Sequence, residues 1–215
     1  MSTPAHRARQ VLALRSAGIT DTSALSAIEN VPRELFVPDA FRDRAYEDTA
    51  LPIGYGQTLS QPLVVATMIQ GLGLVGREKL LEVGTGSGYH AAILSNLCRR
   101  VYTIERHRPL LADAEARFDA LGVNNVVTRA GDGMNGWPEQ APFDRISVTA
   151  ASDTPPQHLL DQLKIGGIMI MPVGGQSRLQ QLVRFTRKEE GFESEVLMDV
   201  RFVPLLPGVA EAADA

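Results

Sequence analysis

The sequence predicts an α/β fold, with a doubly wound, mostly parallel sheet, an N-terminal helical region and a C-terminal antiparallel hairpin. Short apolar runs alternate with segments of helical periodicity between residues 79 and 173, and a glycine-rich turn at 84–88 joins one run to the next helix. After Gly174-Gly175, apolar residues recur at every second position instead. Alternating strands and helices favour right-handed crossovers and a parallel sheet, whereas a period of two favours an added hairpin. The expected architecture is Rossmann-like.

Length and composition favour one domain over residues 1–215. The 215 residues are enough for a single core, and the contents of 44% hydrophobic and 21% charged residues are typical of a soluble globular protein. We divide this domain into an N-terminal helical region with a long loop (1–75), a strand–helix core (76–174) and C-terminal strands with a tail (175–215). The sequence contains no internal repeat.

The charge and cysteine content exclude several classes of function. A net charge of −4 without a basic run gives no general attraction to nucleic acid or to an anionic membrane. No apolar stretch is long enough to span a bilayer, and the amino end leads into no apolar signal core, so we expect a cytoplasmic protein. The single cysteine, Cys98, leaves neither a disulfide framework nor a Cys cluster for a metal, and we expect it to be a small buried hydrophobe.

The N-terminal third is predicted to be helices and loops. A helix is expected over residues 4–17, with Gly18 as its stop, and a second follows Asp21 and Thr22 as candidate caps. The segment 31–38 is bracketed by prolines and reads as irregular. Residues 46–62 lack periodicity and are rich in glycine, proline and hydroxyl side chains, so we interpret them as a long, functional loop. Pro62 suits the first turn of the next helix.

The remaining elements follow in order along the chain. The predicted elements are strands near 79–83, 101–105 and 125–129, helices near 88–97 and 108–121, a strand at 145–149, a helix opened by Pro155-Pro156, a strand at 168–173, and hairpin strands at 178–186 and 194–203. In the last strand, Val196, Met198, Val200 and Phe202 are expected on the buried face. The tail from Gly208 is expected to fray.

The turn Gly84-Thr85-Gly86-Ser87-Gly88 follows an apolar strand ending at Val83. Glycine tolerates positive φ and lets a ligand approach the backbone, and such strand-to-helix turns bind nucleotides and cofactors in open α/β sheets. Tyr89 and His90 stand where a P-loop would carry Lys and Ser or Thr, which argues against a triphosphate site. The glycines follow the pattern G-x-G-x-G, whereas a dinucleotide fingerprint has G-x-G-x-x-G. The alternative is a tight turn needed only for packing.

Acidic residues follow the next two strands. Glu105 ends a strand about twenty residues after the glycine turn, where a carboxylate can bind ribose hydroxyls. Asp132, in Gly131-Asp132-Gly133, suits an adenine amino group. Alone, each has a simpler interpretation: an exposed strand-end Glu and an ordinary Asp-Gly turn. Together the three junctions predict an adenosine site, with S-adenosylmethionine or NAD favoured over ATP.

Ten parts of the sequence share the motifs of a known family: 31–34 with 36–38, 45–48, 51–54, 56–62, 82–89, 102–105, 131–133, 142–146, 149–151 and 202–205. Through these motifs the chain resembles bacterial protein-L-isoaspartate O-methyltransferase along nearly its whole length. The most specific stretch is Leu51 to Pro62, because the cofactor motifs alone indicate only a class I methyltransferase. His90 stands where Gln is expected, and Leu59 where Ile is usual.

The resemblance implies a repair enzyme that methylates the free α-carboxylate of L-isoaspartyl residues, giving an ester that recyclises to succinimide. It implies S-adenosyl-L-methionine as methyl donor, damaged peptides and proteins as partners, and Ser60 as the active-site residue. The alternative for Ser60 is a hydroxyl that caps the helix beginning at Pro62. The cofactor-binding residues implied are Thr58, Leu59, Glu82, Gly84, Thr85, Gly86, Ser87, Gly88, Glu105, Arg106, Gly131, Asp132 and Gly133.

The chemistry needs little beyond placement. A carboxylate acceptor is already ionised at neutral pH, so no general base is required. We expect the loop at 51–62 to close over the acceptor, with Ser60 orienting its carboxylate, and we expect His90 and His158 to be structural or exposed. We also expect a monomer with no metal. The alternatives are a class I methyltransferase for another carboxylate or small molecule, and a non-catalytic S-adenosylmethionine-binding module.

Overall fold

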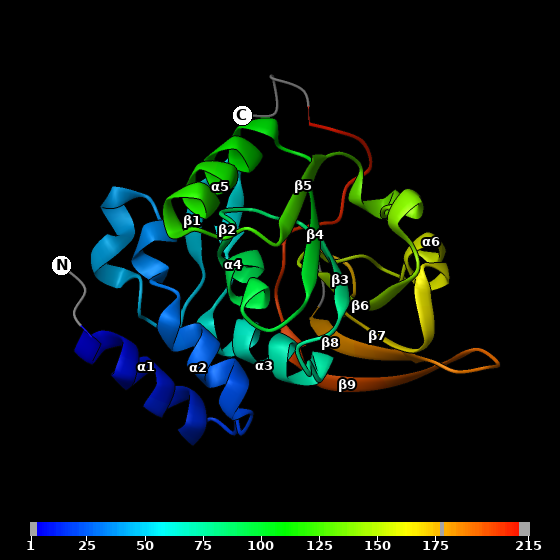
Figure 1. Cartoon of the computed structure of the whole chain (residues 1–215), viewed down its shortest axis with the longest axis horizontal. Coiled ribbons are helices and arrows are strands. Elements are labelled where there is room, and N and C mark those ends of the chain that lie inside the picture. The colour runs from blue at the N-terminus through cyan, green and yellow to red at the C-terminus, as the bar shows by residue number, and fades with distance from the viewer. Residues whose placement is uncertain (1–3, 177–178, 211–215) are drawn as a thin grey trace.

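The computed structural model describes residues 4–176 and 179–210. Its N-terminal region contains helices α1 (Pro4–Ser16), α2 (Thr22–Asn30) and α3 (Pro62–Leu72), which confirms the three helices predicted there. The Asp21 carboxylate caps α2 by accepting hydrogen bonds from the backbone N–H groups of Ser23 and Ala24 at 2.9 and 3.0 Å. Figure 1 shows α1 and α2 lying together at one side of the molecule, next to α3.

A seven-stranded mixed sheet forms the centre of the molecule, with the strand order β5-β4-β3-β6-β7-β8-β9. Five neighbouring strands are parallel, and β8 and β9 join antiparallel at one edge. The predicted parallel core and edge hairpin are therefore confirmed. The strands are β3 (Lys79–Val83), β4 (Arg100–Glu105), β5 (Val126–Ala130), β6 (Phe143–Val148), β7 (Leu163–Val173), β8 (Gln180–Arg187) and β9 (Phe192–Val200).

Helices cover both faces of this sheet, as expected for a doubly wound fold. Successive residues of a strand point to opposite faces. Leu80 of β3 accordingly packs in the core shared with α1–α3, α4 (Tyr89–Ser95) and α5 (Arg108–Leu121), and Leu81 packs in a second core beneath α6 (Gln157–Asp161). The chain runs from β3 to β4 on one side and places β6 on the other side of β3. Open α/β sheets bind ligands where the strand order reverses in this way.

The long segment before α3 is not a loop throughout, so this prediction was wrong. It contains an antiparallel hairpin of β1 (Leu51–Gly54) and β2 (Gln57–Leu59). The turn uses three consecutive positive φ angles, including that of Tyr55 at 54°. Strands of four and three residues are too short to show a period of two. Short 3₁₀ turns cover Arg33–Phe36 (η1), Asp39–Arg44 (η2), Gly133–Asn135 (η3) and Pro138–Gln140 (η4).

Two details of the C-terminal strands also differ from expectation. Strand β7 begins at Leu163, five residues earlier than predicted, through an irregular pairing with β6. Val196 in β9 is 53% exposed, although it was assigned to the buried face. The register of β8 with β9 shifts between Leu182 and Val183, which adds one residue to β9 and breaks the alternation there. Residue 178 and the tail from 211 lie outside the described residues.

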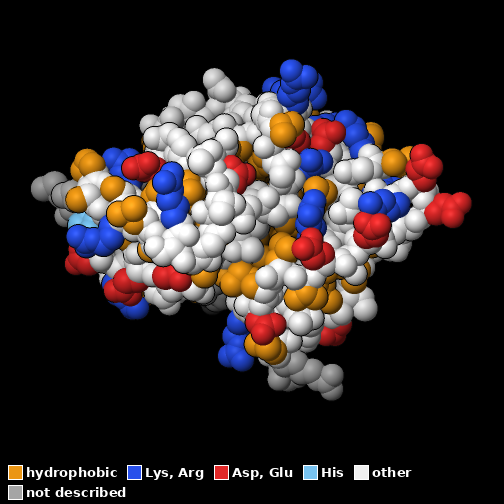
Figure 2. Space-filling model, turned by 90° about the horizontal axis from the view of Figure 1, so that it is seen from below, with side chains coloured by type: hydrophobic (Ala, Val, Ile, Leu, Met, Phe, Trp, Pro, Cys, Tyr) orange, Lys and Arg blue, Asp and Glu red, His pale blue; other side chains and the backbone are white. Residues whose placement is uncertain are grey.

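Acidic and basic side chains are interspersed on the face shown in Figure 2, where the described residues form no large patch of one sign. Within 4–176 and 179–210, no helix has the length and apolarity needed to cross a membrane. Cys98 is buried as predicted, and burial raises the pKa of its thiol to about 12.

Candidate functional site

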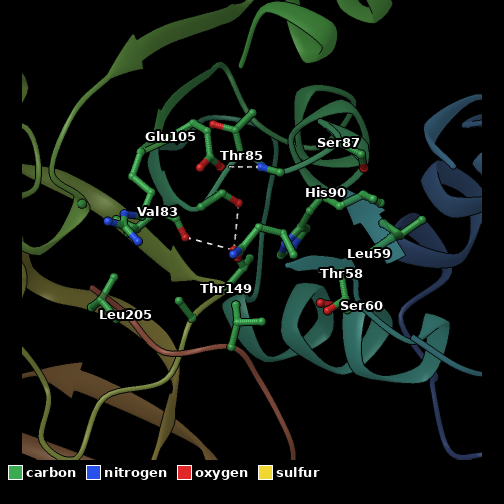
Figure 3. A pocket seen from close by; sticks show the side chains of 18 of the residues that line it. Thr58, Leu59, Ser60, Val83, Thr85, Ser87, His90, Glu105, Thr149 and Leu205 are labelled. Carbon is green, nitrogen blue, oxygen red and sulfur yellow. Dashed lines mark hydrogen bonds between the residues drawn. The ribbon is translucent and has the colours of Figure 1, made fainter. Parts of the chain in front are cut away.

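A cavity lies at the carboxyl ends of β3, β4 and β6, between the glycine turn, the β1–β2 hairpin and the C-terminal segment (Figure 3). Its open space measures about 780 Å³. Glu105 and Thr85 lie on one side of it, and Thr58 and Ser60 lie on the other (Figure 3). The lining residues are Ile53, Gln57, Thr58, Leu59, Ser60, Val65, Val83, Gly84, Thr85, Gly86, Ser87, Tyr89, His90, Ile104, Glu105, Arg106, Gly133, Thr149, Ala150, Val203, Pro204, Leu205 and Leu206.

The glycine turn requires glycine for conformation and for space. Gly84, Gly86 and Gly88 have φ angles of 96°, 54° and 91°, which side-chain-bearing residues rarely adopt. A Cβ on Gly84 would also collide with the Thr149 hydroxyl. That hydroxyl donates to the carbonyls of Val83 and Gly84 at 3.1 and 2.8 Å, which ties the turn to the end of β6.

Glu105 joins the glycine turn to the end of β4. One carboxylate oxygen accepts the Gly86 N–H at 2.8 Å, and the other accepts the His107 N–H at 2.9 Å. The residue is only 5% exposed. A carboxylate oxygen has two lone pairs, so each oxygen retains acceptor capacity toward the cavity. This geometry excludes the simpler interpretation of Glu105 as an exposed strand-end residue.

Beneath the cavity lies a buried polar chain of Glu82, Thr103, Thr85 and His90. Thr103 hydrogen-bonds Glu82, and the hydroxyls of Thr103 and Thr85 are 2.6 Å apart. His90 Nδ1 lies 3.7 Å from Glu82 Oε1. Burial raises the pKa of Glu82 to about 8, assisted by the nearby charge of Glu105 and opposed by the Thr103 hydrogen bond. Burial lowers the pKa of His90 to about 4, so its imidazole is neutral at physiological pH.

Ser60 follows β2 and lines the cavity from the side of the hairpin. The residue before helix α3 is Gln61, and no side chain there caps the helix. Asp48 serves that end instead, since its carboxylate accepts the Leu63 N–H at 2.9 Å and the Gln61 side-chain amide at 2.8 Å. The geometry gives no support to a capping role for Ser60, and its hydroxyl is left for a ligand.

A buried arginine fixes the segment that carries Ser60. Arg33 is 0% exposed and donates to the carbonyls of Ala45 and Ser60, each at 2.7 Å. Its guanidinium lies over the ring of Tyr89, 4.9 Å from the centroid. One side chain therefore connects η1, the end of η2, the Ser60 segment and the first turn of α4 (Tyr89–Ser95). We call this set of contacts the Arg33 clamp.

The structure brings ten of the predicted site residues to the cavity wall: Thr58, Leu59, Ser60, Gly84, Thr85, Gly86, Ser87, Glu105, Arg106 and Gly133. Glu82 and Gly88 are buried beside it. Gly131 and Asp132 line a neighbouring cavity that shares Ile104 with the first. The sequence interpretation missed Thr149, which the end of a parallel strand could have indicated. It also missed the wall formed by residues 203–206.

Residues 203–206 reach the cavity by pairing with the segment after β6. Ala151 N–H donates to the Val203 carbonyl at 2.8 Å, and Leu205 N–H donates to the Ala151 carbonyl at 2.7 Å. The side chain of Gln180 also accepts the Phe202 N–H at 2.6 Å. These bonds hold a segment that is neither helix nor strand. Its sequence has no periodicity from which its position could be predicted.

Several polar atoms of the cavity wall lack a partner within the chain. Ser87 Oγ, His90 Nε2 and Arg106 Nε are buried and make no hydrogen bond among the described residues. Buried polar atoms normally have partners, so these atoms suit a bound ligand with several polar groups, such as an amino-acid tail attached to a nucleoside. The described residues contain no group of three or more His, Cys, Asp or Glu side chains able to hold a metal ion.

The buried Glu82 predicts a specific dependence of stability on pH. Its pKa rises from about 4.5 in the unfolded chain to about 8 in the fold, so its stability contribution is full below 4.5 and lost as pH rises through 8. The pKa of His90 is lowered by burial, so its effect on stability is confined to pH values between about 4 and 6.5. We therefore expect the melting temperature to fall between pH 6.5 and 8.5, and to fall less in Glu82→Gln. Parallel curves from scanning calorimetry would contradict the buried, protonated state of Glu82.

Comparison with known proteins identifies the family. The family model for protein-L-isoaspartate(D-aspartate) O-methyltransferase matches residues 6–210. Protein-L-isoaspartate O-methyltransferase of Rhodospirillum centenum is 58% identical over 99% of this chain and 97% of its own length. The Rhodospirillum rubrum protein of the same name is 57% identical, over 97% of this chain and 96% of its own length.

Two solved structures that resemble this chain carry the same family description. A protein-L-isoaspartate O-methyltransferase structure superposes with a TM-score of 0.84 at 31% identity, covering 92% of this chain and 65% of that chain. A Plasmodium falciparum structure, described as a putative enzyme of this type in complex with S-adenosyl-L-homocysteine, has a TM-score of 0.79 at 24% identity, covering 94% and 98% of the two chains, and supports the fold alone. From the family model and the relatives together, this chain belongs to the protein-L-isoaspartate(D-aspartate) O-methyltransferase family.

Proposed function

We propose how the cavity carries out the reaction that family membership assigns to this chain, the methylation of L-isoaspartyl residues with S-adenosyl-L-methionine as donor. The glycine turn and Glu105 hold the donor, and the β1–β2 hairpin with Ser60 holds the acceptor. The observation that carries this division is the position of Glu105 and Ser60 on opposite sides of one cavity (Figure 3). The three regions thus divide the work, with 76–174 binding the donor, 1–75 the acceptor, and 175–215 supplying one wall.

Glu105 is the proposed ribose anchor. Its two oxygens are already oriented by Gly86 and His107, so a ribose meets a carboxylate held in place before binding. Ile104 belongs to both the main cavity and the cavity lined by Gly131 and Asp132. An adenine ring beside Ile104 would bring its amino group toward that second cavity.

The donor's amino-acid tail fits the other half of the wall. The unpartnered Ser87 Oγ and His90 Nε2 supply hydrogen-bonding atoms there. The surface there has no large side chains, because it is formed by Thr85, Gly84 and Gly133. A Cβ on Gly84 would collide with Thr149, and a Cβ on Gly133 would collide with Val83. We assign Thr58 and Leu59 to the boundary between donor and acceptor, because both lie in β2 beside Ser60.

An open groove next to Ser60 is the proposed site for the acceptor peptide. Its open space, measured in the same way as that of the main cavity, is about 1140 Å³, and it shares Thr58 and Ser60 with that cavity. Its other side is formed by residues 199–204 at the end of β9. A peptide in the groove would present its carboxylate past Ser60 to the donor. The hydroxyl of Ser60 would donate a hydrogen bond to that carboxylate.

The chemistry is a single displacement. An acceptor oxygen forms a bond to the methyl carbon while the carbon–sulfur bond breaks, leaving a neutral thioether and a neutral ester. No proton moves, so the residues of this chain need only align the two reactants and exclude water. The neutral imidazole of His90 is consistent with this, because it adds no competing charge beside the reacting pair.

We further propose that the enzyme acts as a cytoplasmic monomer and binds neither nucleic acid nor membranes. The net charge of −4 and the mixed surface charges in Figure 2 give the protein little attraction for polyanions such as nucleic acids or anionic membranes, which supports this proposal. Light scattering during chromatography at several concentrations would test this proposal.

Glu105→Gln should weaken donor binding while keeping the shape of the side chain. The ribose would lose a charged acceptor, and hydrogen bonds to charged groups contribute roughly 1.5–3 kcal/mol. We expect the Kd for S-adenosylmethionine to rise by about tenfold or more in calorimetric titration. Asp113→Asn, an exposed carboxylate of α5, is the control and should bind as wild type does. Unchanged affinity in Glu105→Gln would remove Glu105 from the donor site.

Ser60→Ala should reduce the methyl-transfer rate far more than the affinity for the donor, because the hydroxyl orients only the acceptor. Single-turnover transfer of labelled methyl to an isoaspartyl peptide measures that step, and the same peptide with normal Asp gives the background. Thr67→Ala, a hydroxyl in α3 bonded only to the Leu63 carbonyl, is the matched control. Wild-type rates in Ser60→Ala would show that the hydroxyl has no role in the reaction.

A further inference from the structure

Arg33 places a buried positive charge directly behind Ser60. The guanidinium is hydrogen-bonded to the carbonyl of Ser60 itself, at 2.7 Å, while the Ser60 side chain faces the cavity and the groove. Because a residue's carbonyl and side chain are separated by only a few bonds, an anion that accepts from the Ser60 hydroxyl must lie close to this cation. The field of a buried charge is screened much less than that of an exposed one.

No carboxylate neutralises this charge among the described residues. Within the described residues Arg33 forms no ion pair, and its Nη1 has no hydrogen-bond partner. Tyr89 and the more distant Asp48 favour the charged guanidinium, but neither is ion-paired with it, and the Asp48 oxygens accept hydrogen bonds from Gln61 and Leu63. Burial also lowers the pKa of the Arg33 guanidinium. A buried cation without a counter-ion is costly to stability, so the position calls for an anion that arrives from outside.

We propose that Arg33 is a positioning residue that selects a negatively charged acceptor, by placing its charge behind Ser60 where the isoaspartyl carboxylate binds. This proposal rests on the proposed role of Ser60. It goes beyond the clamp, since the carbonyl contacts alone would fix the loop for a charged or a neutral acceptor. It assigns the preference for a carboxylate to a side chain that does not touch the acceptor.

Two other cations border the site, and neither has the same position. Arg106 follows Glu105, the last residue of β4, and lines the main cavity but not the groove. Arg201 lines the groove but is exposed, where solvent and salt weaken its attraction for an anion. Arg201 is therefore the natural competitor in an experiment, because it could also contact the acceptor.

The charge of Arg33 should act on binding more than on the chemical step. The acceptor is anionic before transfer and neutral afterwards, so a nearby cation stabilises the bound carboxylate more than the transition state. Interactions stronger in the ground state raise affinity without raising kcat. Removing the charge should therefore raise KM for the peptide, whereas loss of the hairpin's alignment would lower kcat.

The test compares two peptides that differ only in charge. One carries L-isoaspartate, and the other carries the same residue with its α-carboxylate replaced by a carboxamide. Their Kd values are measured by calorimetry on enzyme saturated with S-adenosyl-L-homocysteine. Arg33→Gln removes the charge but can still donate to one carbonyl, Arg33→Lys keeps the charge, and Arg201→Gln removes the competing cation. Binding of S-adenosyl-L-homocysteine to each variant reports that the fold is intact.

We expect wild type and Arg201→Gln to bind the acid at least about tenfold more tightly than the amide, a preference of the size that close charges give at interfaces. Arg33→Gln should bind both peptides almost equally, and Arg33→Lys should recover most of the preference. If Arg33→Gln weakens both peptides alike, Arg33 is only a clamp and the proposal is wrong. Loss of the preference in Arg201→Gln would assign it to Arg201 instead.

The wild-type enzyme provides a test that does not depend on a variant that folds. Equal affinity for acid and amide in wild type would overturn the proposal whatever the variants do. Failure of the proposed role of Ser60 has a different signature, because Ser60→Ala would then transfer the methyl group at the wild-type rate. An enzyme that methylates the peptide but shows no preference for the acid would refute the inference about Arg33 alone.

Discussion

The hydrogen bond from Gly86 N–H to the Glu105 carboxylate is the contact on which the site depends. It joins the turn after β3 to the end of β4, and the Thr149 hydroxyl joins the same turn to the end of β6. The three strands are parallel neighbours, so the hydrogen bonds of the sheet bring their carboxyl ends to one edge. A rigid sheet thus fixes the proposed donor site, while the proposed acceptor site is built on shorter elements and needs additional support.

That support comes from buried ionisable side chains and costs stability. Arg33 and Glu82 are both fully buried, and neither has an ion pair with a residue of opposite fixed charge among the described residues. Burial opposes the charged state of each group, and a core of apolar residues would be cheaper in free energy. Arg33 donates to the Ser60 carbonyl and Glu82 lies 3.7 Å from His90, so each adjoins a residue that lines the cavity. The fold loses some stability to hold polar groups where the reactants bind.

The sequence predicted the parts of this structure that depend on local patterns. Alternating apolar runs gave the order of strands and helices, and the glycines at 84, 86 and 88 indicated the turn because their positive φ angles have a direct sequence signature. The β1–β2 hairpin was not predicted, since strands of three and four residues carry no measurable period. The exposure of Val196 depends on a register shift between two strands, which pairing decides and local sequence does not.

The candidate site was predictable to the same extent. Residues on the glycine turn and strand ends were found because parallel strands end together. Arg33 was seen only as part of a matching segment, because nothing in the sequence indicates that its guanidinium reaches Ala45 and Ser60. The wall at residues 203–206 depends on hydrogen bonds to Ala151, about fifty residues earlier in the chain. Contacts of this kind come from tertiary packing.

The central claim is that methyl transfer here needs placement and no general base. It is tested most directly by kcat/KM for an isoaspartyl peptide at saturating S-adenosylmethionine between pH 6 and 8.5. The acceptor carboxyl has a pKa near 4 and His90 is neutral above about 4, so neither titrates in this range. Glu82, whose pKa burial raises to about 8, does titrate in it, but Glu82 does not line the cavity and takes no part in the proposed transfer. We predict that kcat/KM stays within about threefold across it. A rise of about tenfold that is absent in His90→Gln would show that His90 accepts a proton during the reaction and would contradict the account.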